Sequence, residues 1–206
     1  MFFYTKNTKK SCTFNTADKV NEAALTLFAE HGFFNTSIHH IQKKSQVSIG
    51  SIYHHFGSKE AIAESLQKKI LEQMEESFID VINQYDTFQE KYYHIIELLF
   101  LMTENEPRAM QFIFHSKYSE YSKLSKSIYQ SKPFLAIHKE VKIHCNNSVM
   151  DQKIHSVDLT MALLFGFSIQ LIQLRLDKIM TKPVTLETDT VFNAVWNGIC
   201  SEKQTI

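Results

Sequence analysis

The chain has 206 residues, and its 22 Lys and Arg balance 22 Asp and Glu, so the formal net charge is zero. This length allows one large or two small domains with a sizeable core, which excludes a need for disulfide or metal staples. Neutrality on its own argues against nucleic-acid binding. However, residues 1–60 have seven lysines against four acids, so positive charge gathers at the N-terminal end.

Cysteine usage and terminal composition predict a soluble cytoplasmic protein. Cys12, Cys145 and Cys200 are far apart and form no CxxC pair, as expected of reduced thiols. The first ten residues place apolar side chains before charges, the reverse of a signal peptide. The longest apolar stretch, near Met161–Phe167, is too short to span a bilayer, so we expect no membrane contact.

Residues 1–14 predict a flexible arm with three lysines, either a solvated tail or an auxiliary DNA contact. Asn15 or Thr16 then caps a helix whose apolar residues recur at helical spacing. Gly32 ends this helix, which we expect to be scaffold.

The stretch from Thr36 to Lys59 predicts two short helices joined by a tight turn. Ser48 is the expected N-cap of the second of these helices, and Gly57 is expected to end it. The formal charges from Asn35 to Lys59 are three lysines, and there is no acid. A helix pair with a basic, hydroxyl-rich surface fits a major groove flanked by phosphates.

Three segments in register resemble the TetR family of bacterial transcriptional regulators. They are AALTLFAEHGF from Ala23, TSIHHI from Thr36 and VSIGSIYHHFGSKE from Val47, within a match of roughly residues 16–66. The resemblance implies a helix-turn-helix DNA-binding domain at 15–66, an effector-binding and dimerisation domain at 67–206, and a homodimer on a palindromic double-stranded operator. Gln42 and Ser45 replace the usual alanines. Gln46 replaces the usual turn glycine, at a cost of about 1 kcal/mol for positive φ.

The same resemblance implies roles for single residues. Ile49, Gly50 and Ser51 occupy base-facing positions of the second helix, where Ile49 meets a thymine methyl and Gly50 allows close approach. Phosphate contacts are expected from Thr36, Ser37, Tyr53, His54 and Lys59. Lys43, Lys44 and Ser48 add further DNA-binding donors to this surface.

After Ser58 a long helix is expected to reach about Gln84, and Tyr92–Met102 should be a buried central helix. The surplus of Phe, Met and Tyr predicts a pocket for a mainly apolar effector, although most of these side chains must also serve as core. Candidate lining residues are Met74, Phe78, Phe100, Phe112 and Phe165, with His94 or Glu97 meeting one polar group. For Glu97 itself we favour the simpler position at the edge of the core.

The last two helices, near 154–179 and 186–200, have more apolar surface than one core requires. They predict a self-complementary four-helix interface between two copies, as the resemblance also implies. Candidate interface residues are Leu171, Leu174, Val195, Trp196 and Ile199. In total the sequence predicts an all-α fold of about nine helices without strands.

No sequence motif indicates catalysis or a cofactor. GxSxG, GxGxxG, GxxxxGK[ST] and HExxH are absent, and the histidines lack metal-site spacing, so we expect no catalytic residue, metal or cofactor. The favoured function is a homodimeric repressor released by an effector. Two alternatives stay open: a pocketless DNA-binding regulator that acts through a protein partner, and an enzyme or carrier with an incidental head domain.

Overall fold

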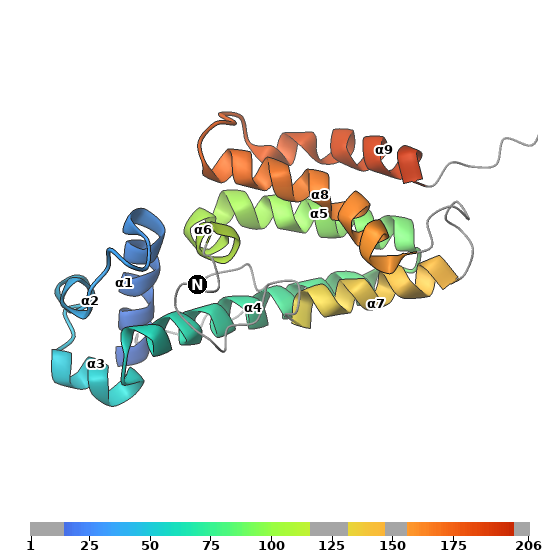
Figure 1. The fold of residues 1–206 in the computed structure, drawn as a ribbon. Coiled ribbons are helices and arrows are strands. Elements are labelled where there is room, and N and C mark those ends of the chain that lie inside the picture. Colours follow the sequence, from blue (N-terminus) through green and yellow to red (C-terminus); the bar gives the residue numbers. More distant parts are fainter. Residues whose placement is uncertain (1–14, 116–131, 147–155, 200–206) are drawn as a thin grey trace, which may run out of the picture. The chain divides into compact units, whose positions relative to one another are not determined.

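The computed structural model describes residues 15–115, 132–146 and 156–199 (Figure 1). These ranges contain nine α-helices, a short 3-10 helix and no strand, which confirms the predicted all-α fold. The predicted arm, Cys12 and Cys200 lie outside them. The helices are α1 (Thr16–His31), α2 (Ile38–Ser45), α3 (Ile49–Phe56), α4 (Lys59–Gln84), α5 (Phe88–Asn105), α6 (Pro107–His115), α7 (Lys132–Asn146), α8 (Val157–Leu176), the 3-10 helix η3 (Val184–Glu187) and α9 (Thr188–Ile199).

The chain forms two compact units. Unit 1 comprises Met1–Met74 and Arg108–Ser131, and unit 2 comprises Glu75–Pro107 and Lys132–Ile206. Helix α4 contributes to both units. The boundary that the sequence predicts at residue 66 falls inside α4 and stays a prediction.

Unit 1 is built on α1, which packs against α2 and α3. The side chain of Asn15 caps its start by accepting from the Asp18 amide at 2.8 Å, and Gly32 ends it at φ 80°. The Phe28 ring lies 5.4 Å from Phe33 and 5.9 Å from Phe112, measured between centroids. This aromatic core fixes the end of α1, from which the chain enters the helix pair.

Unit 2 is centred on α5, which packs against α7, α8, α9 and η3. The prediction that α5 is a buried central helix is confirmed, since Ile96, Leu99 and Phe100 are at most 1% exposed. The hydroxyl of Tyr92 donates to the Leu164 carbonyl at 2.6 Å, which joins α5 to α8 inside the core. The Tyr92 ring also lies 6.0 Å from that of Trp196 on α9.

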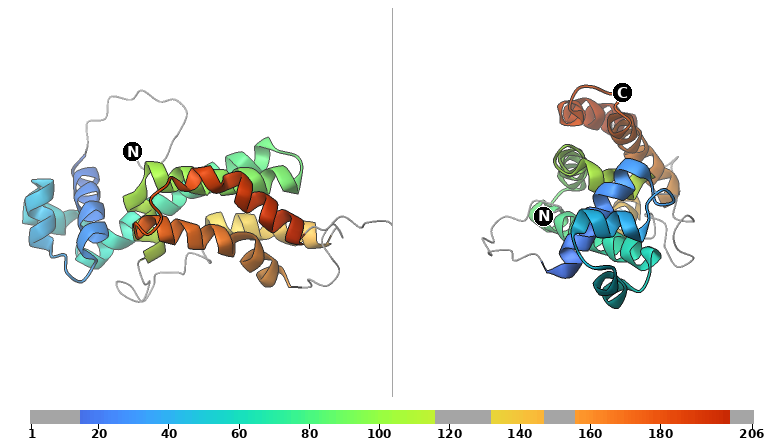
Figure 2. Two further views of the ribbon diagram at one scale, coloured as in Figure 1. Left: turned by 90° about the horizontal axis from the view of Figure 1, so that it is seen from above. Right: turned by 90° about the vertical axis from the view of Figure 1, so that its left-hand side faces the viewer.

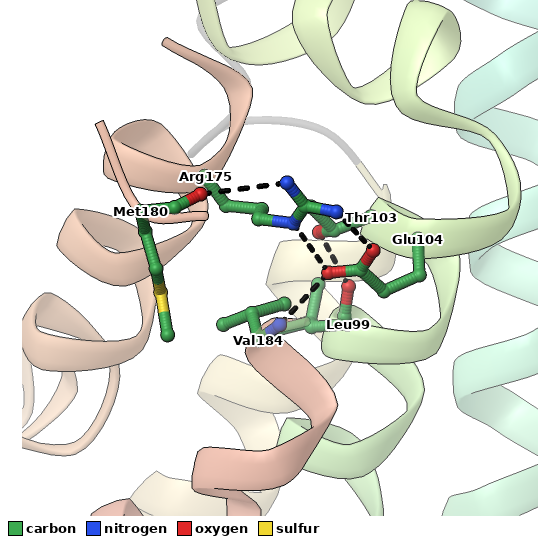
Figure 3. A network of polar contacts seen from close by, with 6 residues as sticks. All are labelled: Leu99, Thr103, Glu104, Arg175, Met180 and Val184. Carbon is green, nitrogen blue, oxygen red and sulfur yellow. Dashed lines mark hydrogen bonds and ion pairs between the residues drawn. The ribbon is translucent and has the colours of Figure 1, made fainter. Parts of the chain in front are cut away.

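The connection between α8 and α9 is held by a polar network (Figure 3). Glu104 at the end of α5 accepts from Arg175 of α8 and from the backbone amide of Val184 in η3. Arg175 also donates to the Met180 carbonyl at 3.4 Å. One carboxylate therefore holds the segment between the last two helices, which run beside each other in both views of Figure 2.

Helix α8 has an exposed apolar strip formed by Leu159, Leu163 and Phe167, which are 50%, 42% and 62% exposed. Its 20 residues have a mean hydropathy of 1.6 in the most apolar window, so by length and composition α8 could cross a membrane. The prediction from the shorter stretch Met161–Phe167 was therefore wrong about length. One such helix is weak evidence for a membrane span, and the opposite face of α8 packs within unit 2.

Candidate nucleic-acid interface

Helix α2 begins with a reciprocal cap. The Ser37 hydroxyl accepts from the His40 amide at 3.2 Å, and the Ser37 amide donates to Nδ1 of His40 at 3.3 Å. Histidine takes the position that glutamate or glutamine holds in most capping boxes. Ile41 on the inner face is fully buried, which fixes α2 against α1. Ser37 is therefore occupied as a helix cap, and its role as a phosphate ligand stays a prediction.

The turn between α2 and α3 shows how the chain accommodates its unusual residues. Gln46 has φ 58° and ψ 25°, the left-handed conformation that glycine adopts at lower cost. The Ser45 hydroxyl donates to the Gln42 carbonyl at 3.4 Å and accepts from the Val47 amide at 3.3 Å. The serine that replaces alanine thus adds hydrogen bonds to the turn in which Gln46 is strained.

Helix α3 presents one face outward. Its N-cap is Ser48, whose hydroxyl accepts from the Ser51 amide at 3.2 Å, and Ile52 is fully buried beneath it. Gly50, Tyr53, His54 and His55 are exposed, while Ile49 and Ser51 are half-buried. Gly57 ends the helix at φ 78°. A capped and anchored short helix with a polar, acid-free face has the form that enters a major groove.

Two predicted phosphate ligands are directed inward. Thr36 is 1% exposed, and its hydroxyl lies 3.3 Å from the Leu27 carbonyl and 2.9 Å from the Gly32 carbonyl. This is a correction: a buried hydroxyl engaged by its own backbone is not available to DNA. Lys59 Nζ donates to the carbonyls of Phe33 and Thr36, each at 2.8 Å, and lies 4.1 Å from the Phe33 ring centroid.

Burial lowers the pKa of Lys59, although the neighbouring Glu60 opposes this effect. Two of its three ammonium donors tie the start of α4 to the loop before α2. Lys59 therefore stabilises the helix pair in the first place, and a phosphate contact through the remaining donor stays a prediction. Lys43 and Lys44 are exposed on α2, as expected for such contacts.

A comparison with protein families decides what this helix pair is. Residues 21–66 match the model described as "Bacterial regulatory proteins, tetR family". Residues 21–66 are therefore similar to the DNA-binding segment of TetR-family regulators. The matched stretch contains α2 and α3 entire, together with most of α1.

Curated relatives match a part of this chain. The HTH-type transcriptional regulator UidR of Escherichia coli K12 is 39% identical over 51 residues, 25% of this chain and 26% of UidR. The HTH-type transcriptional repressor AcnR of Corynebacterium efficiens is 32% identical over 63 residues, 31% of this chain and 34% of AcnR. The matches thus span between a quarter and about a third of these relatives.

Solved structures resemble this chain over most of its length. The fatty acid degradation regulator FadR from Bacillus halodurans has a TM-score of 0.76 at 18% identity, covering 88% of this chain and 98% of FadR. FadR from Bacillus subtilis in complex with stearoyl-CoA has a TM-score of 0.75 at 20% identity, covering 86% and 96%. At such identities the likeness shows a shared fold, over 88% and 86% of this chain.

The predicted effector-binding residues are distributed over both units. Met74 and Phe112 are buried in unit 1, whereas Phe78, Phe100 and Phe165 are buried in unit 2. His94 Nδ1 lies 2.8 Å from Glu97 Oε2, and the Glu97 side chain is 44% exposed. Glu97 therefore takes the favoured position at the core edge, and the pocket roles stay predictions.

One buried polar group in unit 2 was not predicted. Ser168 of α8 is 0% exposed, and its hydroxyl has no hydrogen-bond partner among the described residues. Sequence gave no signal for it, because serine is common on solvated helix faces.

The predicted dimer residues are less exposed than the strip Leu159, Leu163 and Phe167 of α8. Leu171, Leu174, Val195 and Trp196 are half-buried, and the Ile199 side chain lies outside the described residues. Sequence reasoning missed the strip Leu159, Leu163 and Phe167. Periodicity could have found it, since these residues recur at helical spacing. A hollow of about 510 Å³ beside the strip is lined by Phe167, Leu171, Leu174, Ile179, Met180, Glu187, Thr190, Val191 and Ala194.

Proposed function

We propose that this protein is a sequence-specific, double-stranded-DNA-binding transcriptional regulator without enzymatic activity, acting in the cytoplasm. The observation that carries the proposal is the outward, acid-free face of α3, held by the Ser48 cap and buried Ile52 inside the family match. The names of the curated relatives, a transcriptional regulator and a repressor, support the same function. Repression follows by analogy with the second of these.

The proposal includes a homodimer on a palindromic operator. Its support is the strip of α8, whose three large apolar side chains face solvent next to an apolar hollow. A second copy related by a two-fold axis would bury both features, because an isologous contact pairs the same strip with itself. Two copies of α3 would then read two half-sites, each of which binds weakly alone.

The proposal also includes an apolar effector bound within unit 2. Phe78, Phe100 and Phe165 form part of its buried core, and the Ser168 hydroxyl lacks a partner among the described residues. An apolar ligand with one polar group would supply that partner. The stearoyl-CoA named with the Bacillus subtilis FadR structure makes long-chain acyl thioesters the first compounds to test.

Selection of genomic fragments by the purified protein tests the central claim. We expect recovery of fragments with a shared inverted repeat, bound more tightly than random DNA of equal length. If no DNA binds at low salt, the regulator function is wrong and the carrier alternative gains support. If DNA binds but no apolar compound alters binding, the protein-partner alternative is favoured.

A further inference from the structure

The half of α4 that belongs to unit 2 lies beside α7, and the two helices have opposite charge. From residue 75 to residue 84, α4 has three acids and no lysine or arginine, whereas α7 has three lysines and one acid. Lys132 Nζ at the start of α7 lies 3.6 Å from Glu75 Oε2, so these helices are neighbours within one unit (Figure 1). An exposed patch on each helix extends this difference in charge to the surface.

The acidic patch of α4 consists of Glu76, Ile79 and Asp80. Their i, i+3, i+4 spacing places the three side chains together on one face of the helix. All three are exposed, and Ile79 is 39% exposed. Phe78 is fully buried and fixes the rotation of this half of α4. The patch therefore presents an isoleucine between two carboxylates to solvent.

The basic patch of α7 consists of Lys139, Lys142 and Ile143. These residues have the same i, i+3, i+4 spacing as the acidic patch. All three are exposed, and Ile143 is 47% exposed. Ile137 and Val141 are buried in the core of unit 2, which fixes the opposite face of α7 inward. The patch therefore presents an isoleucine beside two ammonium groups.

The charges of both patches are open to a partner. Glu140 is the acid of α7, but it lies 2.8 Å from Lys91 Nζ of α5 and its side chain is only 20% exposed. Among the described residues, the structure records no ion pair for the four charged side chains of the patches. Each patch thus lacks, within the described parts of its own chain, the opposite charge that the other patch presents.

We propose that the acidic and basic patches form a self-complementary surface on which a second copy of this protein docks, separate from the strip of α8. A two-fold axis places the basic patch of each copy on the acidic patch of the other, because an isologous contact repeats every pairing. Two ammonium groups then meet two carboxylates at each half of the contact, and the isoleucines leave water. Charge complementarity makes such a contact specific and salt-sensitive.

A second copy fits the surface better than other occupants do. An anionic membrane would attract α7 but repel the neighbouring acidic patch, and the wide apolar face of α7 that a membrane would need is buried. An unrelated acidic protein would pair with α7 and leave the acidic patch without a partner. Only an occupant with both charges in the same spacing satisfies the two patches together.

The test uses full-length protein with Leu163→Glu as background, because this change is designed to remove the α8 contact. The α7 variant adds Lys139→Glu and Lys142→Glu, and the α4 variant adds Glu76→Lys and Asp80→Lys. In sedimentation velocity, we expect the background protein to associate with rising concentration in about 0.1 M salt. Association should be lost in about 1 M salt, because the screening length falls from about 10 Å to about 3 Å.

Each charge variant alone should associate at least about tenfold more weakly than the background protein, because like charges meet in both halves of the contact. An equimolar mixture of the two variants should restore association. The new carboxylates on α7 then face the new ammonium groups on α4, and the two unaltered patches still match. Restoration also shows that both variants are folded.

The matched control is Lys43→Glu with Lys44→Glu, which changes the net charge by the same amount on an exposed part of unit 1. Alone it should associate as the background protein does. Mixed with the α4 variant it should not restore full association, because the lysines of its α7 face the new lysines on α4. Equal restoration by this control would show that net charge, and not the two patches, causes the association.

The proposal is overturned if the background protein stays monomeric in about 0.1 M salt. It is also overturned if the charge variants associate normally, or if the mixture does not restore association, which would assign the basic patch to a different acidic occupant. If the background protein is still a dimer and the charge variants dissociate it, the α8 interface is wrong and the contact between the patches is supported. DNA binding does not enter this test.

Discussion

Arg175 of α8 and Glu104 of α5 form a two-pronged ion pair, with Nε 2.8 Å from Oε1 and Nη2 2.9 Å from Oε2. Oε1 also accepts from the Val184 amide at 2.8 Å. Both side chains are less than one-third exposed, so water screens the pair only partly. These bonds lower the pKa of Glu104, the Arg175 contact most, whereas burial opposes them.

We expect Glu104→Gln to reduce the free energy of unfolding by about 2 kcal/mol at pH 7. A lowered folded-state pKa means that the stabilisation is fully present above the unfolded pKa. It is lost as pH falls through the folded value. The difference between wild type and variant in urea unfolding should therefore be constant from pH 7 to about 5.5 and shrink below the ordinary carboxyl pKa of 4.5. An equal difference at pH 7 and pH 3 would contradict this assignment.

The strained turn predicts two opposite effects on stability. Gln46→Gly should raise the free energy of unfolding by about 0.5 to 1 kcal/mol, because glycine adopts positive φ without a Cβ clash. Ser45→Ala should lower it by about 1 kcal/mol through loss of hydrogen bonds to the turn. Thermal unfolding of both variants and the double mutant measures this. If Gln46→Gly instead lowers the free energy of unfolding, contacts of the glutamine side chain stabilise the fold by more than the positive φ destabilises it.

Gly50 separates DNA binding from folding. A Cβ added at this position meets no atom within 4 Å, and the residue is exposed in α3. Gly50→Ala should therefore leave the Tm unchanged or higher, since alanine favours helix. If the backbone approaches a base edge here, the methyl group should weaken binding to the selected fragment at least about tenfold, a cost of about 1.4 kcal/mol. Fluorescence anisotropy titrations of the selected fragment measure this affinity. If Gly50→Ala binds as tightly as wild type, Gly50 does not contact DNA.

The strip of α8 predicts the oligomeric state. Leu163→Glu should convert a dimer into a monomer in sedimentation velocity and weaken operator binding with it, because a charge would be buried in the interface. Leu135→Glu is the matched control: this leucine of α7 is 52% exposed, against 42% for Leu163. Dimers that persist in the Leu163 variant, or a wild type that is monomeric at micromolar concentration, would contradict the proposed interface.

Ser168 gives a test of the proposed effector. The panel of apolar ligands is screened by thermal shift and by operator binding in parallel. A true effector should weaken DNA binding by the same factor by which DNA weakens effector binding. Ser168→Ala should retain the wild-type Tm within a few degrees, because no hydrogen bond within the described residues is lost, yet reduce effector affinity about fivefold or more. If wild type and Ser168→Ala bind the effector with equal affinity, Ser168 does not contact it.

Local chemistry let the sequence by itself determine where helices begin and end. Asn15, Ser37 and Ser48 cap helices in the structure, and Gly57 stops α3, because a cap requires only a side chain and the backbone a few residues away. The family resemblance was also visible in the sequence, because the residues of Val47–Glu60 that match the family pattern follow one another along the chain. The left-handed conformation of Gln46 was likewise implied by its place in that register.

Only the tertiary structure decided which of the chemically suitable side chains are free. Thr36 and Lys59 have groups that could bind phosphate, but the carbonyls at the end of α1 and in the following loop engage them. On α8, the fold left Leu163 in solvent and made Leu171 half-buried, although both are leucines on one apolar helix. The physical reason is the same in both cases. Burial and hydrogen-bond occupancy depend on which faces of distant segments meet, and this information is not contained in local sequence.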